Sequence, residues 1–478
     1  MKLYVKRSLC LIAALLMLVV AFSACGSGAD AESSAPSGTA SNNPNSSDVT
    51  VVPNTPDIEE GSKYDPATWD PYATISDSIK GQTVRHATWG DPTTNESAVA
   101  YANFEADTGL KCEVFAVPQS GYPEHIKMKI AIGDAPDVFM TNEGNQSFPL
   151  TLEIASPINL VSTVDLDDPI WDKSMLESTR LNGNIYGVNT IGTPHTGSNL
   201  VFFNKRLFEE NGFKTPAEYY AENDWTWDNM LKCLKDIKSL STNSDIYYGA
   251  QLELDILAGS VGASFTKYNY ETDTFSSGVN DPKLLAAFQW YADAKEQGLL
   301  DGNINRFVQG RCGIIVRGTW GLKANGYFAD MSPEDVGFTY MPSFEVGEKS
   351  YVSSIYRVYG ICEGAHHPDA AGYFIRYLLD PANYDLQNTF ITPEAGNFYY
   401  ELTNRTASEK YFNFDAGLAT LLGQDQNTAF YNPVKGTSSA GVKTAIDSVS
   451  NKVDTAVELA NQLIAAKVEA DRQNYQKK

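Results

Sequence analysis

Aromatic and polar side chains stand directly after three buried strands predicted in this chain of 478 residues. They are Trp89 and Asp91 after residues 83–88, Asn142 and Glu143 after residues 137–141, and Trp320 after residues 311–317. Ligands of open parallel sheets bind beyond the carboxyl ends of the strands, so we expect these side chains to face one site. An indole ring covers the apolar C–H face of a sugar, while carboxylates and amides bind its hydroxyls. The residue types therefore predict a site for a polyhydroxylated ligand.

Three other polar residues could reach the same site. They are His195 in the sequence GTPHTG, Glu253 in QLELDIL, and Arg357 at the start of a strand predicted at 356–362. Structural roles are alternatives for several candidates: His195 as a loop or hinge residue, Asp91 as a helix cap, and Asn142 with Glu143 as part of a loop. We assign Trp227, at the start of an amphipathic helix, to the core.

Strands and helices alternate along the segment that must position these residues. Strands are predicted at 83–90, 111–117 and 137–141, with helices at 95–109 and 124–136 between them, which indicates an α/β fold with mainly parallel sheets. The later part of the chain continues in the same style. We expect strands at 184–189, 199–205, 311–318, 336–342 and 356–362, and helices at 205–212, 226–240, 281–298 and 367–380.

A long amphipathic helix is predicted near the end of the chain, with apolar residues spaced from Val442 to Val468. It could pack on its own domain or form a coiled-coil seam, and we expect the first.

The N-terminal segment has the pattern of a bacterial lipoprotein signal. A basic start precedes an apolar run from Leu9 to Phe22, which is shorter than the roughly 18–20 residues that span a bilayer. The run ends in FSAC, which resembles the lipobox whose cysteine is acylated, here Cys25; an ordinary secretion signal is the alternative. We expect a signal peptide at 1–24 and a lipidated Cys25. Residues 25–64 are then a flexible tether rich in Ser, Gly, Asn and Pro.

The composition excludes some partners. The chain has 36 basic and 59 acidic residues, a net charge of −23, which argues against nucleic acid and against docking on anionic lipid. Four cysteines follow Cys25 at wide spacing with no C-x-x-C pair; they are Cys112, Cys233, Cys312 and Cys362. Two disulfides are possible in an extracellular protein, but buried thiols fit the spacing better.

Several colinear stretches resemble the extracellular solute-binding proteins of bacterial ABC importers, in the carbohydrate-binding group. They are FEADTGLKCEVFAVP, IGDAPDVFM, IYGVNTIG, LVFFNKRLFEENGF, TWDNMLKCLKDI, FVQGRCGIIVRGTWGL and HHPDAAGYFIRYLLDP. The resemblance implies a two-lobed periplasmic-binding-protein-like fold of type II, with each lobe an α/β unit and the ligand cleft between the lobes. It also places Trp320 on the tryptophan of a G-x-W motif that lies against the sugar.

The expected organisation and function follow from that resemblance. Lobe one spans 80–190 plus 350–390, and lobe two spans 194–345 plus 392–478. The expected protein is a monomer without cofactor or metal, anchored by lipid outside a Gram-positive cell. It captures a sugar or oligosaccharide and delivers it to a permease.

Other chemistries remain as alternatives. The sequence has no H-E-x-x-H, G-x-S-x-G, Walker A or G-x-G-x-x-G motif, so we do not expect an enzyme. A glycoside hydrolase needs two placed carboxylates, which the acidic composition could supply. A binding protein for a peptide, a polyamine or ferric ion is the other alternative.

Overall fold

The computed structural model describes residues 50–51, 58–65, 68–94, 97–141, 148–192, 197–355 and 357–474. The predicted signal peptide, Cys25 and the tether up to residue 49 lie outside the described residues, and so do Asn142, Glu143 and His195. Residues 49–478 form one compact unit, and all of the description below concerns that unit.

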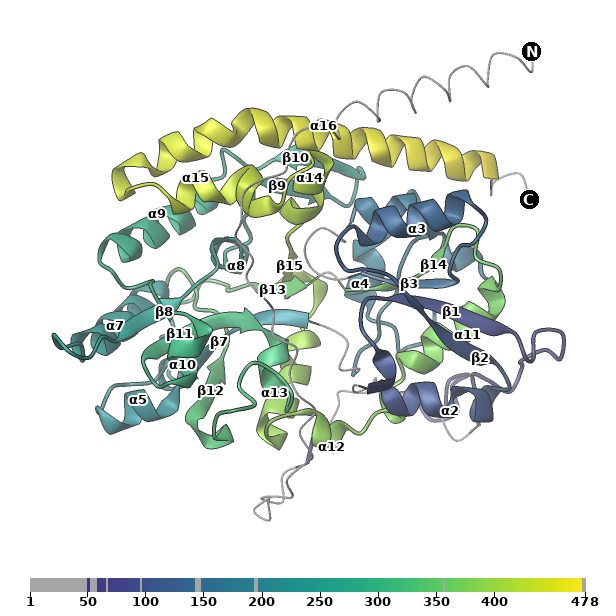
Figure 1. Ribbon diagram of the computed structural model, residues 1–478, viewed down its shortest axis with the longest axis horizontal. Helices are drawn as coiled ribbons and strands as arrows, with labels where there is room; N and C mark the ends of the chain where they lie inside the picture. Colours follow the sequence, from purple (N-terminus) through teal and green to yellow (C-terminus); the bar gives the residue numbers. More distant parts are fainter. Residues whose placement is uncertain are drawn as a thin grey trace. The chain divides into compact units, whose positions relative to one another are not determined.

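The first sheet has five strands in the order β2-β1-β3-β14-β4 (Figure 1). The strands are β1 (Thr83–Thr88), β2 (Lys111–Ala116), β3 (Val138–Met140), β4 (Ala155–Ser156) and β14 (Tyr359–Cys362). β1 is parallel to β2 and to β3, as the alternating pattern predicts, while β14 is antiparallel to both of its neighbours. Helices α2 (Ala98–Thr108) and α11 (Pro368–Leu378) supply Phe104 and Phe374 to one core of this sheet. Helix α3 (Tyr122–Ala131) contributes Tyr122 and Ile126 to another core, together with Phe139 of β3.

The second sheet has six strands in the order β15-β13-β7-β11-β8, with β12 also paired to β7. The strands are β7 (Gly197–Asn204), β8 (Tyr248–Gln251), β11 (Cys312–Gly318), β12 (Val336–Thr339), β13 (Val352–Ile355) and β15 (Lys410–Phe412). Alternate side chains of β7 enter different cores: Val201 and Phe203 lie in one, Leu200 and Phe202 in the other. This alternation is the period of two expected of a strand covered on both faces.

The helices around the second sheet follow the sequence pattern closely. α7 (Trp227–Ser239) begins at the cap residue Thr226, whose side chain accepts a hydrogen bond from the Asn229 amide, and it buries Trp227, Met230 and Leu234. Trp227 is 1% exposed, which confirms its assignment to the core. α5 (Lys205–Glu210) and α9 (Pro282–Glu296) lie where helices are predicted.

The long C-terminal helix α16 (Val442–Asn474) packs on its own chain. It contacts α9, α14 (Asp415–Leu421), α15 (Asn432–Lys435) and β10 (Thr274–Ser277) on the second-sheet side. Near its end, the Lys467 ammonium donates to the Ala155 carbonyl at 2.7 Å, and Asp471 accepts from the Tyr186 hydroxyl. The helix therefore reaches residues next to the first sheet as well.

Two predicted strands are shorter in the structure. The segment at 184–189 is a strand only at Asn184–Ile185 (β6), in a hairpin with Arg180–Leu181 (β5) whose turn holds Asn182 and Gly183 at positive φ. The segment at 356–362 begins as a strand only at Tyr359, so Arg357 precedes β14 and does not start it. This corrects the predicted position of Arg357.

Two short segments carry the chain between the sheets. Val188 forms a single antiparallel bridge with Tyr359 of the first sheet, and β7 of the second sheet begins nine residues later at Gly197. On the return, β13 ends at Ile355 in the second sheet and β14 begins at Tyr359 in the first. The strand directions place both segments at the carboxyl ends of the parallel strands in each sheet.

The remaining predictions concern cysteines and domain limits. Cys112, Cys233, Cys312 and Cys362 are free thiols, three of them buried, as the spacing predicts. The lobe limits at 80–190 plus 350–390 and 194–345 plus 392–478 stay a proposal; in the structure, β13 pairs with the second sheet. Residues 63 and 64, predicted as tether, contact Asp165 through the Lys63 ammonium and the Tyr64 hydroxyl, at 3.1 and 3.0 Å.

Candidate functional site

A cluster of charges lies where β8 and β11 end. Glu253 lies two residues after the end of β8, and Arg317 lies one residue before the end of β11, which runs parallel to β8. An Arg317 guanidinium nitrogen lies 2.9 Å from Glu253 Oε1, and the Lys435 ammonium lies 3.4 Å from Glu253 Oε2. All three side chains are 24–32% exposed, so the cluster is accessible to a ligand.

Neighbouring side chains form hydrogen bonds with Lys435 and with Asp255, which lies two residues after Glu253. Lys435 also donates to Asn427 Oδ1 at 2.8 Å. Gln426 donates to Asp255 Oδ2 at 3.3 Å. Burial raises the pKa of Asp255 to about 6, with a further contribution from the charge of Glu253, while Lys435 acts in the opposite direction. Carboxylates and an arginine held together in this way can bind hydroxyl groups through charge-assisted hydrogen bonds.

Trp320 stands at the same end of β11, in the short helix η4 (Thr319–Leu322). Its side chain is 38% exposed, whereas Trp225 and Trp227 are buried. The Lys323 ammonium lies 5.0 Å from the centre of the ring. Backbone pairs between Ile391 and Leu322, and between Ala324 and Thr389, fix the segment that carries it. An exposed indole held on a fixed turn can serve as a stacking surface.

Arg357 lies on the segment that joins β13 to β14. Its carbonyl accepts a hydrogen bond from the Asn189 side chain at 2.9 Å, and Asn189 belongs to the other segment that runs between the sheets. The Arg357 side chain is half-buried. The structure therefore places Arg357 where the two connecting segments meet.

The first sheet contributes Trp89 and Asp91 just beyond β1. Trp89 is half-buried and packs edge-on against Tyr122, with ring centres 5.2 Å apart. Asp91 is exposed, and its Oδ1 accepts hydrogen bonds from the Thr93 amide at 2.9 Å and the Thr93 hydroxyl at 2.5 Å. These bonds lower the pKa of Asp91. The carboxylate thus caps the turn η1 (Pro92–Thr94), which is the structural role considered as the alternative for this residue.

The structure thus groups part of the predicted site. It places Glu253 and Trp320 after the carboxyl ends of the neighbouring parallel strands β8 and β11, and it puts Arg357 on the segment that joins β13 to β14. Trp89 and Asp91 lie at the corresponding edge of the first sheet. Asn142, Glu143 and His195 lie outside the described residues, and the binding role of every candidate stays a prediction.

Three members of the cluster were missed by sequence reasoning. Arg317 had a signal, since a charged residue near the end of the apolar strand CGIIVRG stands out. No sequence signal marked Lys435 and Gln426. They contact Glu253 and Asp255 only because the chain folds back to them after α14.

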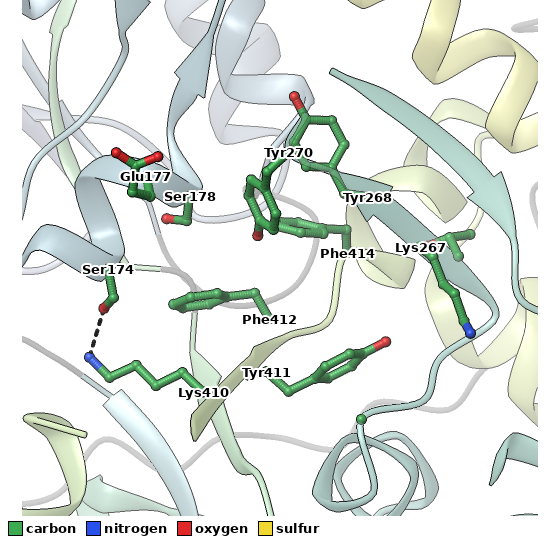
Figure 2. Close-up of a pocket in the computed structure, with 12 residues that line it drawn as sticks. Ser174, Glu177, Ser178, Lys267, Tyr268, Tyr270, Lys410, Tyr411, Phe412 and Phe414 are labelled. Carbon is green, nitrogen blue, oxygen red and sulfur yellow. Dashed lines mark hydrogen bonds between the residues drawn. The ribbon is translucent and has the colours of Figure 1, made fainter. Parts of the chain in front are cut away.

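An aromatic pocket of about 390 Å³ lies elsewhere in the structure (Figure 2). Its walls come from α4 (Lys173–Ser178), β9 (Thr266–Asn269) and β15, and include Tyr268, Tyr270, Tyr411, Phe412 and Phe414. Both of its lysines are engaged within the protein, Lys410 with Asp172 and Lys267 with Asp281.

The pocket and the charged cluster lie at opposite sides of the second sheet. β15 is one edge strand and β8 is the other, with the strands that lead to the first sheet, β13 and β7, between them. We keep the charged cluster as the candidate site, because its polar groups suit a hydroxylated ligand better than the mainly aromatic wall of the pocket.

Other classes of site were sought in the described part of the chain. Its histidines, cysteines and carboxylates form no group of three that could hold a metal ion. Its helices include none with the length and apolarity that a bilayer crossing requires.

Comparison with known families gives one match. The family of bacterial extracellular solute-binding proteins matches residues 89–385. Curated protein sequences give no match.

Many solved structures share the fold. The cyclic α-maltosyl-1,6-maltose binding protein of Arthrobacter globiformis is 14% identical with a TM-score of 0.59, covering 80% of this chain and 98% of that one. The sugar-binding protein MalE of Xanthomonas citri is 16% identical with a TM-score of 0.58, covering 80% and 99%. The galacto-N-biose-/lacto-N-biose I-binding protein of Bifidobacterium longum is 12% identical with a TM-score of 0.58, covering 82% and 99%. At these identities the likeness shows the fold, the two-lobed architecture of periplasmic binding proteins.

Proposed function

Because the chain belongs to the bacterial extracellular solute-binding proteins, we propose that it captures a sugar or an oligosaccharide and delivers it to the permease of an ABC importer. The family and the structural neighbours are binding proteins and not enzymes.

The observation that carries the sugar assignment is the exposed indole of Trp320, three residues after Arg317, which pairs with Glu253. Trp320 and Glu253 follow the carboxyl ends of the parallel strands β11 and β8, where ligands of open sheets bind. The indole offers a flat apolar surface, and the pair offers a charged donor and a charged acceptor to hydroxyl groups. The neighbours support the same class of ligand, since three of them are binding proteins for a cyclic maltosyl-maltose, a sugar and lacto-N-biose.

Capture would proceed by closure of the two lobes. The segments at 188–197 and 355–359 connect the carboxyl edges of the two sheets, so a rotation about them brings those edges together or apart. A sugar that touches Trp320 on one edge and Trp89 on the other binds the closed state more tightly and shifts the population toward it. The closed form then docks on a permease.

We further propose that the protein is held at the outer face of the cell membrane through a lipidated Cys25. The pattern of the first 25 residues supports this, and the family is extracellular. Two or more acyl chains give stable anchoring where one chain does not. The protein would act as a monomer on a Gram-positive cell.

A thermal-shift screen tests the ligand assignment. The purified Cys25→Ala protein, which cannot be acylated, is heated with mono- and oligosaccharides, peptides, polyamines and ferric citrate. A ligand that binds only the folded form stabilises it by about 2.7 kcal/mol at a hundred times its Kd. We expect one class of sugar to raise the Tm.

The Trp320→Ala variant is expected to lose most of that shift while its own Tm stays near that of the parent, because the side chain is exposed. Tyr327→Ala, which removes another exposed aromatic ring, serves as the control and is expected to keep the shift. If a peptide, a polyamine or ferric ion raises the Tm and no sugar does, the assignment to sugars is wrong. If added sugar is cleaved, the protein is a hydrolase.

A further inference from the structure

The start of the folded body is seated on the second-sheet side of the protein. Val51 is 4% exposed and belongs to the core that also contains Phe390, Ala395 and Tyr399. Val51 packs on a surface formed by α12 (Leu386–Thr389) and α13 (Pro393–Thr403), the α12–α13 surface. A valine buried to this extent at the end of a polar stretch needs a specific partner surface.

The α12–α13 surface forms hydrogen bonds with the backbone of Thr50 and Val51. The Val51 amide donates to Gln387 Oε1 at 3.0 Å, and Gln387 Nε2 donates to the Val51 carbonyl at 3.0 Å. The Asn397 side chain donates to the Thr50 carbonyl at 3.2 Å. One glutamine amide therefore pairs with both polar groups of one residue, as a neighbouring strand would.

The α12–α13 surface also has space for one aliphatic side chain. A Cβ atom placed on Gly396 would lie 2.7 and 2.8 Å from the two methyl carbons of Val51 and 2.9 Å from the Phe390 ring. The absence of a side chain at 396 thus makes the space that Val51 fills. Phe390 in turn pairs with Lys323, next to the turn that carries Trp320.

We propose that the α12–α13 surface is a docking site for the chain's own N-terminal segment, with Val51 as its anchor, and that the tether leaves the body from this surface. The described chain after Val51 makes a second set of contacts on the first-sheet side. Tyr64 bonds Asp165, and Ile75 enters the core of the first sheet. The segment from residue 50 onward is therefore bound on both sides, and within the described part of the chain the docked valine is the attachment nearest to Cys25.

The docking has a consequence for anchoring that rests on the proposed lipidation of Cys25. If Cys25 is lipidated, the chain between the lipid and the docked residues is the 24 residues 26–49.

Hydrogen exchange at the Val51 amide tests the docking without sugar or membrane, so its result is independent of the proposed function. The Cys25→Ala protein is compared with Gln387→Ala, which removes an exposed side chain and leaves the core intact. Asn388→Ala is the matched control, because this neighbouring exposed amide bonds Asp385 and not the tail. We expect exchange at Val51 to be at least tenfold faster in Gln387→Ala than in the parent and the control.

A second variant, Val51→Asp, keeps the backbone and removes the aliphatic anchor. It is expected to release the segment, seen as protease cleavage at residues 50 and 51 that the parent resists. Equal exchange rates at Val51 in all proteins, with equal cleavage, would overturn the proposal. Protection that falls on dilution would also overturn it, since the occupant would then be the tail of a second copy.

Discussion

At the scale of single residues, Glu253 holds two cations at the edge of the second sheet, Arg317 and Lys435. Glu253→Gln removes the charge that both of them face and one charged acceptor for the ligand. Because hydrogen bonds to charged groups are worth about 1.5–3 kcal/mol, we expect sugar affinity to fall by roughly ten- to a hundredfold. Isothermal titration with the sugar found by the thermal screen measures the change. Glu271→Gln, in the exposed turn between β9 and β10, is the control, and equal affinities in both variants would contradict the role of Glu253.

Asp255, beside Glu253, predicts a dependence of stability on pH. Its pKa is raised from 3.8 to about 6, chiefly by burial, so the folded state holds a proton that the unfolded state has released between these values. The carboxyl therefore costs no stability below pH about 4 and costs progressively more as the pH rises through about 6. Asp255→Asn removes this cost. We expect its advantage over the parent in free energy of unfolding to grow from near zero at pH 4 to about 1–3 kcal/mol at pH 7.

Denaturant unfolding at pH 4, 5, 6 and 7 measures that advantage. Asp330→Asn, which alters an exposed carboxylate, is the control and should show no such trend. An Asp255→Asn advantage that is constant with pH would contradict the prediction.

Some residues of the candidate site could be found from the sequence, and others only from the folded structure. Trp320 follows a predicted strand, and the rule that ligands lie beyond strand ends selects it from the sequence. Glu253 follows β8, which the sequence analysis did not predict as a strand. Lys435 and Gln426 come from helices and turns far along the chain, so only the packed fold shows that they reach Glu253 and Asp255. The rule also selected Asp91, but the carboxylate of Asp91 caps its own turn. A short acidic residue that follows a strand and precedes a turn fits the pattern of a ligand contact and the pattern of a turn cap.

At the scale of elements, the turn that presents Trp320 is closed by a glycine. A Cβ atom on Gly326 would lie 2.0 Å from the Trp320 carbonyl oxygen and 2.9 Å from that of Lys323, and both are backbone atoms. Gly326→Ala must therefore open the turn and move Trp320. We expect a loss of stability of about 1–3 kcal/mol and a large loss of sugar affinity.

The matched control for this element is Gly90→Ala. Gly90 directly follows Trp89 in the chain, but a Cβ atom there meets nothing within 4 Å. The control is expected to keep the stability of the parent, as measured by denaturant unfolding. A Gly326→Ala protein with unchanged stability and affinity would show that the turn does not constrain Trp320.

The sequence located those helices and strands whose apolar residues keep one spacing from end to end. The sequences of α7 and α9, and the alternation in β7, sufficed to locate these elements. The segments near 184–189 and 356–358 were predicted as strands because they are apolar. In the structure they approach or join the connecting segments, where the chain leaves one sheet for the other and loses its neighbours. Apolar composition does not distinguish a strand inside a sheet from one that leaves it.

At the scale of the whole molecule, a buried ion pair joins the two sides. Lys410 of β15 lies 2.8 Å from Asp172, with the two side chains 4% and 7% exposed. Asp172 caps α4, whose Leu176 lies in the core of the first sheet. Lys410 also donates to the Ser174 hydroxyl at 2.9 Å. An edge strand of the second sheet is thereby bound to a helix of the first-sheet side, next to the aromatic pocket.

Removal of one partner from this pair should destabilise the whole molecule, because a buried carboxylate loses its compensating charge. Lys410→Met keeps most of the side-chain volume, and we expect it to lower the free energy of unfolding by about 3–5 kcal/mol. The matched control is Lys63→Met, which breaks a pair with Asp165 whose side chains are 63% and 49% exposed; its loss of stability should be much smaller, because solvent screens the pair. Denaturant unfolding of the two variants side by side measures the difference. Equal losses would mean that Lys410 and Asp172 are not held together in the folded protein, and that the two sides meet in some other way at the edge of β15.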